Sequence, residues 1–365
     1  MNSTTAPAPT HQDRPASLLE AFERQAGWCE RLQAPFMALL MRRAKAHLAA
    51  HTGAIHLMLE PAGDPVAGLF ALRLAGALHD LALQGLAPWA AVWQDPLAAD
   101  AAALDAALAA AFTQQPEQLR RFLASAPQTN EVQRSTVLLP GLLHVAQTTG
   151  LPVHLIELGA SAGLNLWCDR WRHEFGSWAW GDAASPLTLH TEWRGQLPAA
   201  RHAALTLAGR SSCDLNPIDI DLPAQRRHLQ AYIWPDQPAR LMRLRTAMAA
   251  AAAWQAAAGV RVEQSDAAPY ALRELATPRP GLATVVFHSV FWQYLPAGTR
   301  AVVRGHIEAA LARATPAAPL AWLRYEHPGA DAPAELRCHL APGGEDVLLA
   351  QVHSHGSWIE WVAQG

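Results

Sequence analysis

The sequence predicts an α/β protein in which an α-helical N-terminal domain precedes a doubly wound, mostly parallel Rossmann-like sheet that ends in a β-hairpin. Before residue 150, Ala and Leu are abundant and apolar positions recur three and four residues apart, which is the spacing of amphipathic helices. After residue 150, short apolar runs alternate with helical stretches, as in parallel sheets. We therefore expect a disordered polar tail over 1–15, a helical domain over 16–150 and a Rossmann methyltransferase-like domain over 151–365.

Each element is expected from its own pattern. Ala/Leu-rich segments with few β-branched residues predict the helices of the first domain, at 18–48, 65–85, 97–112, 116–124 and 131–148. In the second domain, helical periodicity favours helices at 163–174, 222–231, 237–258 and 299–314. Short apolar runs predict strands at 153–158, 187–193, 204–207, 260–264, 283–288, 320–325, 335–340 and 346–353. The last two strands are joined by Ala-Pro-Gly-Gly at 341–344, which is hairpin chemistry.

Composition excludes several classes of protein. The 365 residues carry 28 Lys+Arg against 31 Asp+Glu, a net charge of −3, with no basic stripe that would favour nucleic acid. No window reaches the roughly 18 uncharged apolar residues of a membrane span, and residues 1–15 lack the apolar core of a signal peptide. The four cysteines are scattered without a C-x-x-C pair, which is typical of core thiols. We expect a cytoplasmic protein without membrane or nucleic-acid partners, and the sequence does not indicate its oligomeric state.

The segment that carries chemistry is VHLIELGASAGLNLWCD at 153–169, an apolar strand followed by a small-residue turn and an amphipathic stretch. Gly159-Ala160-Ser161-Ala162-Gly163 fits the G-x-S-x-G nucleophile elbow of serine hydrolases. The same loop, with Glu157 before it, also fits the acid and small-residue loop of nucleoside-binding Rossmann domains.

The order of elements weighs against the hydrolase. An α/β-hydrolase places several strands and an oxyanion loop before its nucleophile, whereas a helical domain precedes Ser161 here. His353 and His355 follow Ser161 in the right chain order, so this alternative stays open. A short Gly/Ser/Ala turn is also what any sharp strand-to-helix bend requires.

A dinucleotide is disfavoured as well. The pyrophosphate fingerprint needs glycine at its first, third and sixth positions, and these positions hold Gly159, Ser161 and Leu164. A ligand with a carboxylate and no phosphate asks less of the loop, and the following helical amides could receive its anion. S-adenosylmethionine is such a ligand, and we expect it as the cofactor.

Three downstream residues end predicted strands and complete the expected site. An acid after the second strand can accept hydrogen bonds from both ribose hydroxyls, and Asp214 is the candidate, with Glu192 the next choice. Asp214 lies 51 residues beyond Gly163 rather than the customary interval of about 20, which the Trp-rich insertion at 167–193 would explain. Asp266 ends the next strand and is expected near adenine. Each acid has a structural alternative, Asp214 as a turn cap and Asp266 as a helix N-cap.

His288 ends the strand ATVVFH at the switch point, where chemistry takes place in open α/β sheets. Its unperturbed pKa near neutrality makes it the expected catalytic base if the substrate must lose a proton. A satisfied core histidine is the structural alternative. Asn130 and Gln133 have the spacing of a capping box, which would explain their polar segment without a ligand.

At these residues the chain resembles a known group of proteins. QTNE at 128–131, IELGASAGLNL at 156–166, DLNPIDI at 214–220, IWPDQPAR at 233–240, VVFHSVFWQYLP at 285–296 and LAQVHSHGSWIEW at 349–361 look like an uncharacterised bacterial family of unknown function. Its sheet resembles the class I S-adenosylmethionine-dependent methyltransferases. That resemblance implies cofactor contacts for Glu157, Gly159, Gly163, Asp214 and Asp266, while Ser161 replaces a frequent glycine.

We therefore expect an S-adenosylmethionine-binding methyltransferase that acts on a small molecule. The expected cofactor residues are Glu157, Gly159, Ser161, Gly163, Asp214 and Asp266, the expected catalytic residue is His288, and no metal ligands are expected. Two alternatives remain: a nucleoside-binding sensor or interaction module without turnover, and a serine hydrolase that uses the Gly159–Gly163 elbow.

Overall fold

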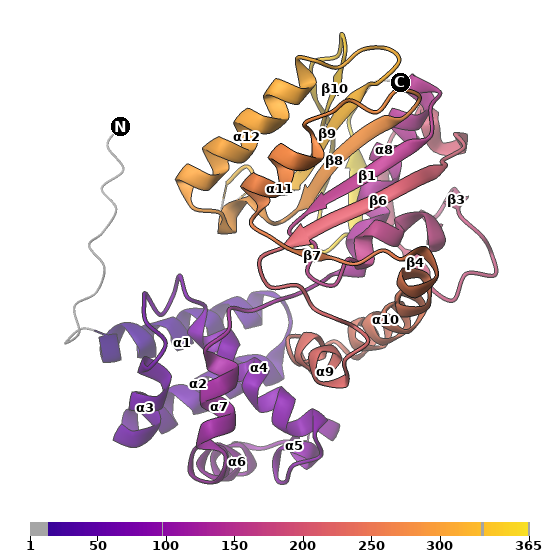
Figure 1. Cartoon of the computed structure of the whole chain (residues 1–365). Helices are drawn as coiled ribbons and strands as arrows, with labels where there is room; N and C mark the ends of the chain where they lie inside the picture. Colours follow the sequence, from indigo (N-terminus) through magenta and orange to yellow (C-terminus); the bar gives the residue numbers. More distant parts are fainter. Residues whose placement is uncertain (1–13, 97, 330–331, 364–365) are drawn as a thin grey trace. The chain divides into compact units, whose positions relative to one another are not determined.

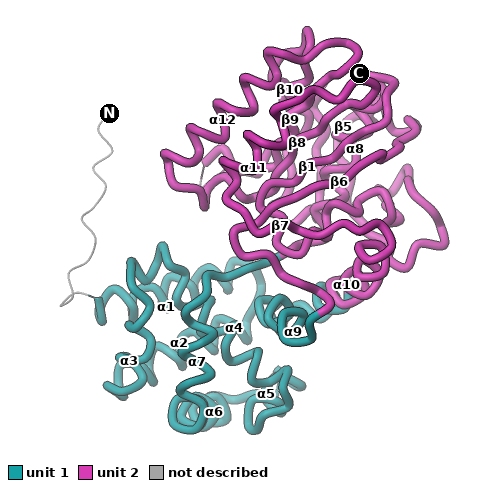
Figure 2. Tube along the Cα trace, in the orientation of Figure 1, with its two compact units in different colours: residues 1–129, 222–242 teal, residues 130–221, 243–365 magenta. Residues whose placement is uncertain are grey.

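The computed structural model describes residues 14–96, 98–329 and 332–363, and these form two compact units (Figures 1 and 2). The tail expected over 1–15 lies outside the described residues except at its end, since the first helix begins at Arg14. The predicted α/β class is confirmed: helices fill the N-terminal region, and a large, mostly parallel sheet with antiparallel C-terminal strands fills the second unit.

The helical unit comprises residues 1–129 and 222–242. Leu18, Phe22, Met37 and Trp89 are among the side chains that fill its core, so each helix buries one apolar stripe against the others. Its described helices are α1 (Arg14–Arg31), α2 (Pro35–Ala50), α3 (Thr52–Leu59), α4 (Phe70–Leu83), α5 (Trp89–Gln94), α6 (Ala101–Gln114), α7 (Pro116–Leu123) and α9 (Pro223–Ala231).

The boundary between the units differs from the single division expected at residue 150. Residues 130–150 belong to the sheet unit, because α8 (Ser135–Thr149) packs on β8, β9 and β10. Residues 222–242 return to the helical unit, where the buried Ala231 and Tyr232 join its core. Apolar periodicity identifies these helices but carries no information on which core receives their apolar faces.

The sheet of the second unit has nine strands in the order β5-β12-β11-β10-β9-β8-β1-β6-β7. Five of them are mutually parallel: β7 (Glu263–Gln264), β6 (Leu207–Asp214), β1 (Val153–Leu158), β8 (Ala283–Ser289) and β9 (Leu320–Glu326). Read in chain order, these strands follow the 3-2-1-4-5 arrangement of doubly wound Rossmann sheets. The chain therefore reverses its winding direction between β1 and β8.

Antiparallel strands extend the sheet beyond β9. The predicted hairpin forms from β10 (Ala334–Ala341) and β11 (Asp346–Val352), and β12 (Trp358–Trp361) adds to it. At the outer edge, β5 (Glu192–Gly195) pairs in parallel with β12. No strand was expected at β12, and the strand expected over 187–193 overlaps β5 only at Glu192 and Trp193, because a pairing across more than 150 residues leaves no local signal.

Helices cover both faces of this sheet (Figure 1). On one face, α11 (Ala267–Glu274) and α12 (Ala297–Leu311) pack through Tyr270, Val303 and Ile307 against apolar side chains of β1 and β8. On the other face, α8 packs against β8, β9 and β10. Burial on both faces accounts for the near-continuous apolar sequences of β1 and β8.

Two predicted elements differ in the insertion. The helix expected over 163–174 is the short 3₁₀ helix η2 (Leu164–Arg170), because Trp167 has non-helical backbone angles and the chain extends from Trp171. The strand expected over 187–193 is split between sheets: β4 (Thr188–His190) joins a separate three-stranded sheet with β2 (Arg172–Glu174) and β3 (Ala179–Trp180). Within the described part of the chain, no helix has the length and apolar character to cross a membrane.

Tight packing at Gly76 tests the assignment of 222–242 to the helical unit. A Cβ on Gly76 in α4 would lie 2.9 Å from both Phe122 of α7 and Tyr232, which follows α9. We predict that Gly76→Leu destabilises the protein by about 1–3 kcal/mol through overpacking. Gly53→Leu is the control, since open space surrounds that exposed glycine. Denaturant unfolding followed by circular dichroism measures both, and equal stability of the two variants would contradict the assignment.

Candidate functional site

The candidate site lies at the carboxyl ends of β1, β6, β8 and β9. In open α/β sheets, ligands bind where the winding direction reverses, which here is between β1 and β8. The structure brings the residues after these strand ends to one edge: the 159–163 loop after β1, Asp214 at the end of β6, and Phe291 just after β8.

The 159–163 loop has an unusual backbone. Gly159, Ser161 and Gly163 adopt left-handed φ angles of 74°, 53° and 69°. The amides of Gly159 and Ala160 both donate to the carbonyl of Cys213 at 3.0 Å, which ties the loop to the end of β6. Glycine takes this conformation freely, whereas serine adopts it at a cost of about 1–2 kcal/mol. Ser161 is therefore a strained residue at the switch point.

Asp214 holds this loop in place. Its Oδ2 accepts the amide of Ser161 and its Oδ1 accepts the amide of Asn216, each at 2.8 Å. These two contacts are those of a turn cap, which is the structural alternative for Asp214. Because each carboxylate oxygen has two lone pairs, further acceptance from a ligand remains compatible with this geometry.

Asp266 acts as a helix cap. Its Oδ1 accepts the amide of Ala268 at 2.8 Å at the start of α11. The first amide of η2 is satisfied as well, since Leu164 donates to Oδ1 of Asn130 at 2.9 Å. A carboxylate expected at those amides would therefore compete with Asn130.

Glu157 is a buried acid beneath the loop, with only 2% of its surface exposed. Its Oε2 has no hydrogen-bond partner among the described residues. Burial raises the pKa of Glu157 well above its usual range, the Asp214 carboxylate raises it further, and the Arg134 guanidinium opposes both. The group therefore favours its neutral acid form, in which it can donate a hydrogen bond.

The hydroxyl of Ser161 is buried too, and its Oγ has no hydrogen-bond partner among the described residues. A serine nucleophile requires a base within hydrogen-bond reach, and no described histidine supplies one. The geometry thus retains the strained turn of an elbow without the group that would activate it.

His288 is completely buried and both of its ring nitrogens are in use. Trp322 donates its indole N–H to Nε2 at 3.1 Å, and Nδ1 lies 2.6 Å from Oε1 of Glu326. Because an indole can only donate, Nε2 must be an acceptor, and the neutral ring carries its proton on Nδ1. This arrangement does not support the role of catalytic base predicted for His288; the histidine positions Glu326.

Phe291 covers the loop. Glu326 also accepts the amide of Phe291, at 3.0 and 3.2 Å from its two oxygens. The Phe291 ring then occupies the space where a side chain on Gly159 would begin, so that only glycine fits there. The preceding Val290 has a φ of 50°, which is an outlier for a β-branched residue. Such strain clusters at functional sites.

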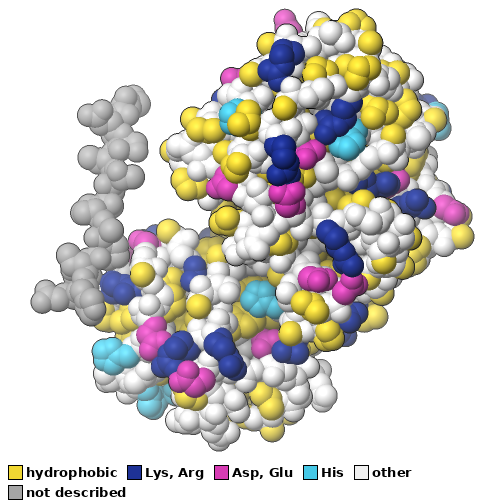
Figure 3. All heavy atoms as spheres, in the orientation of Figure 1, with side chains coloured by type: hydrophobic (Ala, Val, Ile, Leu, Met, Phe, Trp, Pro, Cys, Tyr) yellow, Lys and Arg dark blue, Asp and Glu magenta, His cyan; other side chains and the backbone are white. Residues whose placement is uncertain are grey.

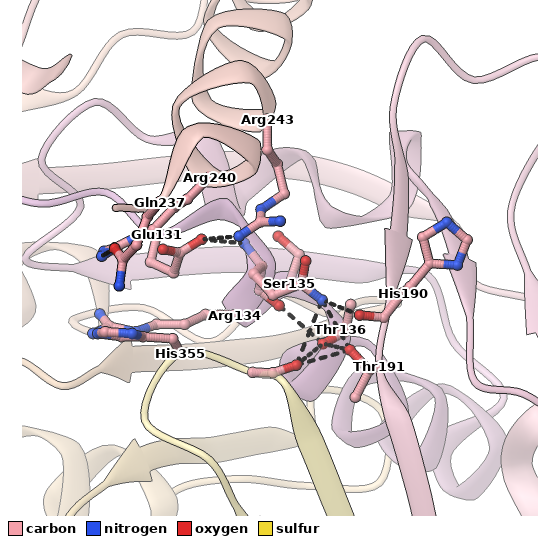
Figure 4. Close-up of polar contacts among 12 residues, drawn as sticks. Glu131, Arg134, Ser135, Thr136, His190, Thr191, Gln237, Arg240, Arg243 and His355 are labelled. Carbon is pink, nitrogen blue, oxygen red and sulfur yellow. Dashed lines mark hydrogen bonds and ion pairs between the residues drawn. The ribbon is translucent and has the colours of Figure 1, made fainter. Parts of the chain in front are cut away.

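A buried polar segment completes the site, in a place where the sequence predicts a capping box. Instead of capping one another, Asn130 binds η2, and Gln133 donates its side-chain amide to Thr191 Oγ1 at 2.9 Å and to the His190 carbonyl at 2.8 Å (Figure 4). All residues from Asn130 to Thr136 are buried, the polar ones being Asn130, Glu131, Gln133, Arg134, Ser135 and Thr136. The signal in the sequence was a run of polar residues at the start of an apolar helix.

Arg134 is the residue of this segment that lies at the switch point. Its Nη1 donates to the carbonyl of Ser289 at the end of β8, and its Nε donates to the carbonyl of Ser354, at 3.0 and 3.1 Å. The side chain is 8% exposed and forms no ion pair with any described residue. A buried cation is normally paired with an anion.

Two further kinds of site were compared with the described residues, a metal centre and a basic patch for nucleic acid. Among the described residues, no three His, Cys, Asp or Glu side chains gather as metal ligands. His353 and His355 lie in the turn after β11, which ends at Val352. On the face drawn in Figure 3, basic side chains are interspersed with acidic ones and form no continuous basic patch.

The comparison with protein families gives one match. Residues 19–361 fit the model of DUF2332, described as an uncharacterized protein conserved in bacteria. The chain belongs to the DUF2332 family. The searches of curated proteins and of solved structures returned no match.

The DUF2332 match includes every residue named in this candidate site, from Asn130 to Ser354. It also spans both compact units, so that the family is defined by the helical unit as well as by the sheet. The family description gives no activity, and a function for this DUF2332 member has to be argued from the site.

Glu157 predicts a pH dependence of stability. For an acid whose folded pKa is raised, the folded state binds the proton more tightly, so stability falls as the pH rises from the unfolded pKa to the folded one. We predict that Glu157→Gln removes this part of the decline above about pH 4.5. Denaturant unfolding at pH 5–8 measures it, with the exposed Glu345→Gln as control. If the free energies of unfolding of wild type and Glu157→Gln change with pH in parallel, other interactions offset the burial of Glu157 and the prediction is wrong.

Proposed function

We propose that this protein binds S-adenosylmethionine, or a close relative that combines a nucleoside with a carboxylate, at the 159–163 loop and transfers a methyl group to a small molecule. The proposal is supported by the 3-2-1-4-5 strand order, which puts this loop at the switch point, and by the acid Asp214 at the end of the neighbouring strand.

The observation that carries the proposal is the pair Ser161 and Arg134. Ser161 keeps a strained backbone where glycine would relax it, and its buried hydroxyl has no partner among the described residues. Arg134 is a buried guanidinium without an ion pair in the same described part of the chain. Both features cost stability in the absence of a ligand, and both are explained by one that brings a polar group and an anion to this edge.

The donor set fits such a ligand on one condition. Glu157, Ser161 and Asp214 offer hydrogen-bonding groups along the loop, and Arg134 offers a cation for a carboxylate. The Phe291 ring, however, fills the space above Gly159 through which a nucleoside would approach the backbone. Binding therefore requires the ring to rotate away.

Bound there, the cofactor would supply an electrophilic methyl group on a sulfonium, so the protein's task is mainly alignment. Asp214 and Ser161 would orient the nucleoside, and Arg134 would hold the carboxylate. Where the acceptor must lose a proton, Glu326 would take it, because its carboxylate is half-buried at this edge and His288 fixes its position.

A binding module without turnover is the second candidate. It is favoured by the hydrogen bonds of His288, which occupy both ring nitrogens and leave neither of them for a substrate, and by the Phe291 ring that covers Gly159. In such a module, displacement of Phe291 would be the response to the ligand. Methyl transfer to a panel of small acceptors distinguishes the two, since a sensor binds the nucleoside without consuming it.

Calorimetric titration tests the binding itself. We predict saturable binding of S-adenosylmethionine and S-adenosylhomocysteine and none of NAD. Ser161→Ala should weaken binding roughly threefold to tenfold by removing one hydrogen bond, with little loss of stability. Ser125→Ala, at an exposed serine, is the matched control. Binding of NAD alone, or covalent labelling of Ser161 by a fluorophosphonate, would overturn the proposal.

Phe291→Ala tests the approach to Gly159. Without the ring, no side chain has to be displaced, and we predict that nucleoside affinity rises several-fold. The control is Tyr294→Ala, because this aromatic residue of the same segment is 65% exposed. Melting temperatures of both variants show whether the fold survives. An affinity that falls in Phe291→Ala would mean that the ring forms part of the binding wall.

A further inference from the structure

A pocket separate from the 159–163 loop lies on the α12 face of the sheet, beside the strand ends of β8 and β9. Its volume is about 230 Å³, and α12, β9 and β10 contribute to its wall. Pockets for drug-sized ligands usually measure about 300–1,000 Å³, so this one suits a smaller molecule. Its size limits the ligand to roughly one ring with short substituents.

Aromatic side chains form the floor of this pocket. Trp292 stacks on the His288 ring, with 4.8 Å between centroids and an angle of 14°, and packs against Trp322 at 5.7 Å. The two indole planes are inclined to each other by 58°, and a flat, unsaturated ligand that lies against one of them gains stacking as well as burial.

Three arginines line the wall, and two of them are already paired. Arg324 and Arg337 both contact Asp346, and Arg337 also contacts Glu335. Arg304 lies 5.7 Å from the centroids of both Trp292 and Trp322 and forms no ion pair with any described residue. Its guanidinium is thus the group in the pocket wall that can accept an anion, and its planar fork matches a carboxylate.

The pocket also contains a carboxylate that can bind a hydrogen-bond donor. Glu326 lines the pocket, and the groups that it contacts are the neutral His288 ring and the Phe291 amide rather than a cation. Its carboxylate can therefore accept a further hydrogen bond from a hydroxyl or amino group.

We infer that this pocket binds a small aromatic acid that carries a hydroxyl or amino group. The ring packs against Trp292 and Trp322, the carboxylate binds Arg304, and the hydrogen-bond donor faces Glu326. This site goes beyond the proposed nucleoside site, and its occupancy requires no nucleoside, so that the two proposals fail or succeed separately.

Ligand-observed NMR and calorimetry with the full chain, without nucleoside, test the inference. The probes are 4-hydroxybenzoate, its neutral isostere 4-hydroxybenzamide, and benzoate, which lacks the hydroxyl. We expect saturable binding of 4-hydroxybenzoate, with 4-hydroxybenzamide weaker by about tenfold and benzoate weaker by a smaller factor.

Arg304→Gln supplies the matched variant. It removes the charge from an exposed helix position and should weaken 4-hydroxybenzoate binding about tenfold, while leaving the benzamide unaffected. Arg121→Gln, at an exposed arginine of α7, should change neither. Trp292→Leu should weaken all three probes. The inference is overturned if 4-hydroxybenzoate shows no saturation up to about 10 mM, binds no better than its amide, or binds equally to the Arg304 and Arg121 variants.

Discussion

A buried guanidinium holds the carboxyl edge of the sheet together. Arg134 donates to the carbonyls of Ser289 and Ser354, and α8 begins at the very next residue. The end of β8, the turn after β11 and the helix on one face of the sheet are thus fixed by one side chain. Burying this charge costs several kcal/mol, and hydrogen bonds to carbonyls offset only part of it. The protein keeps a cation at the switch point that its described residues leave without an ion pair.

The backbone conformation of the 159–163 loop is set by hydrogen bonds at the same edge of the sheet. The alternating left-handed angles at Gly159, Ser161 and Gly163 allow consecutive amides to reach Cys213 and Asp214 across the β1–β6 pair. Glycine at the middle position would give the same path with less strain. A serine there adds only its hydroxyl, and that hydroxyl lies buried without a partner in the described structure. Serine at position 161 therefore lowers the folding stability relative to glycine, and the fold alone does not require it.

The central parallel strands β1 and β8 could be predicted because their signals are local, whereas β6 begins only at Leu207, where the strand expected over 204–207 ends. β1 and β8 are apolar runs close to their expected bounds, and Asp214 and Asp266 do end or follow strands. What could not be predicted depends on distant partners. Asn130 caps a helix 34 residues away, β12 pairs with β5, and α9 joins the helical unit although it follows β6 in the chain. Spacing indicates an available hydrogen bond, and tertiary packing decides its partner.

The role of His288 could not be predicted from the sequence either, because it depends on which ring nitrogen carries the proton. Its position at a strand end is legible in the sequence, but its function depends on Trp322, a donor-only group 34 residues away that fixes the tautomer. The result is a rigid unit in which His288 orients Glu326 and Glu326 holds the amide of Phe291. Because that bond anchors the backbone and not the ring, the Phe291 side chain can rotate off Gly159 while the His288–Glu326 pair stays intact. Opening the loop to a ligand thus requires a rotamer change of one half-buried side chain, which is a far smaller cost than rearranging the strained Val290 backbone.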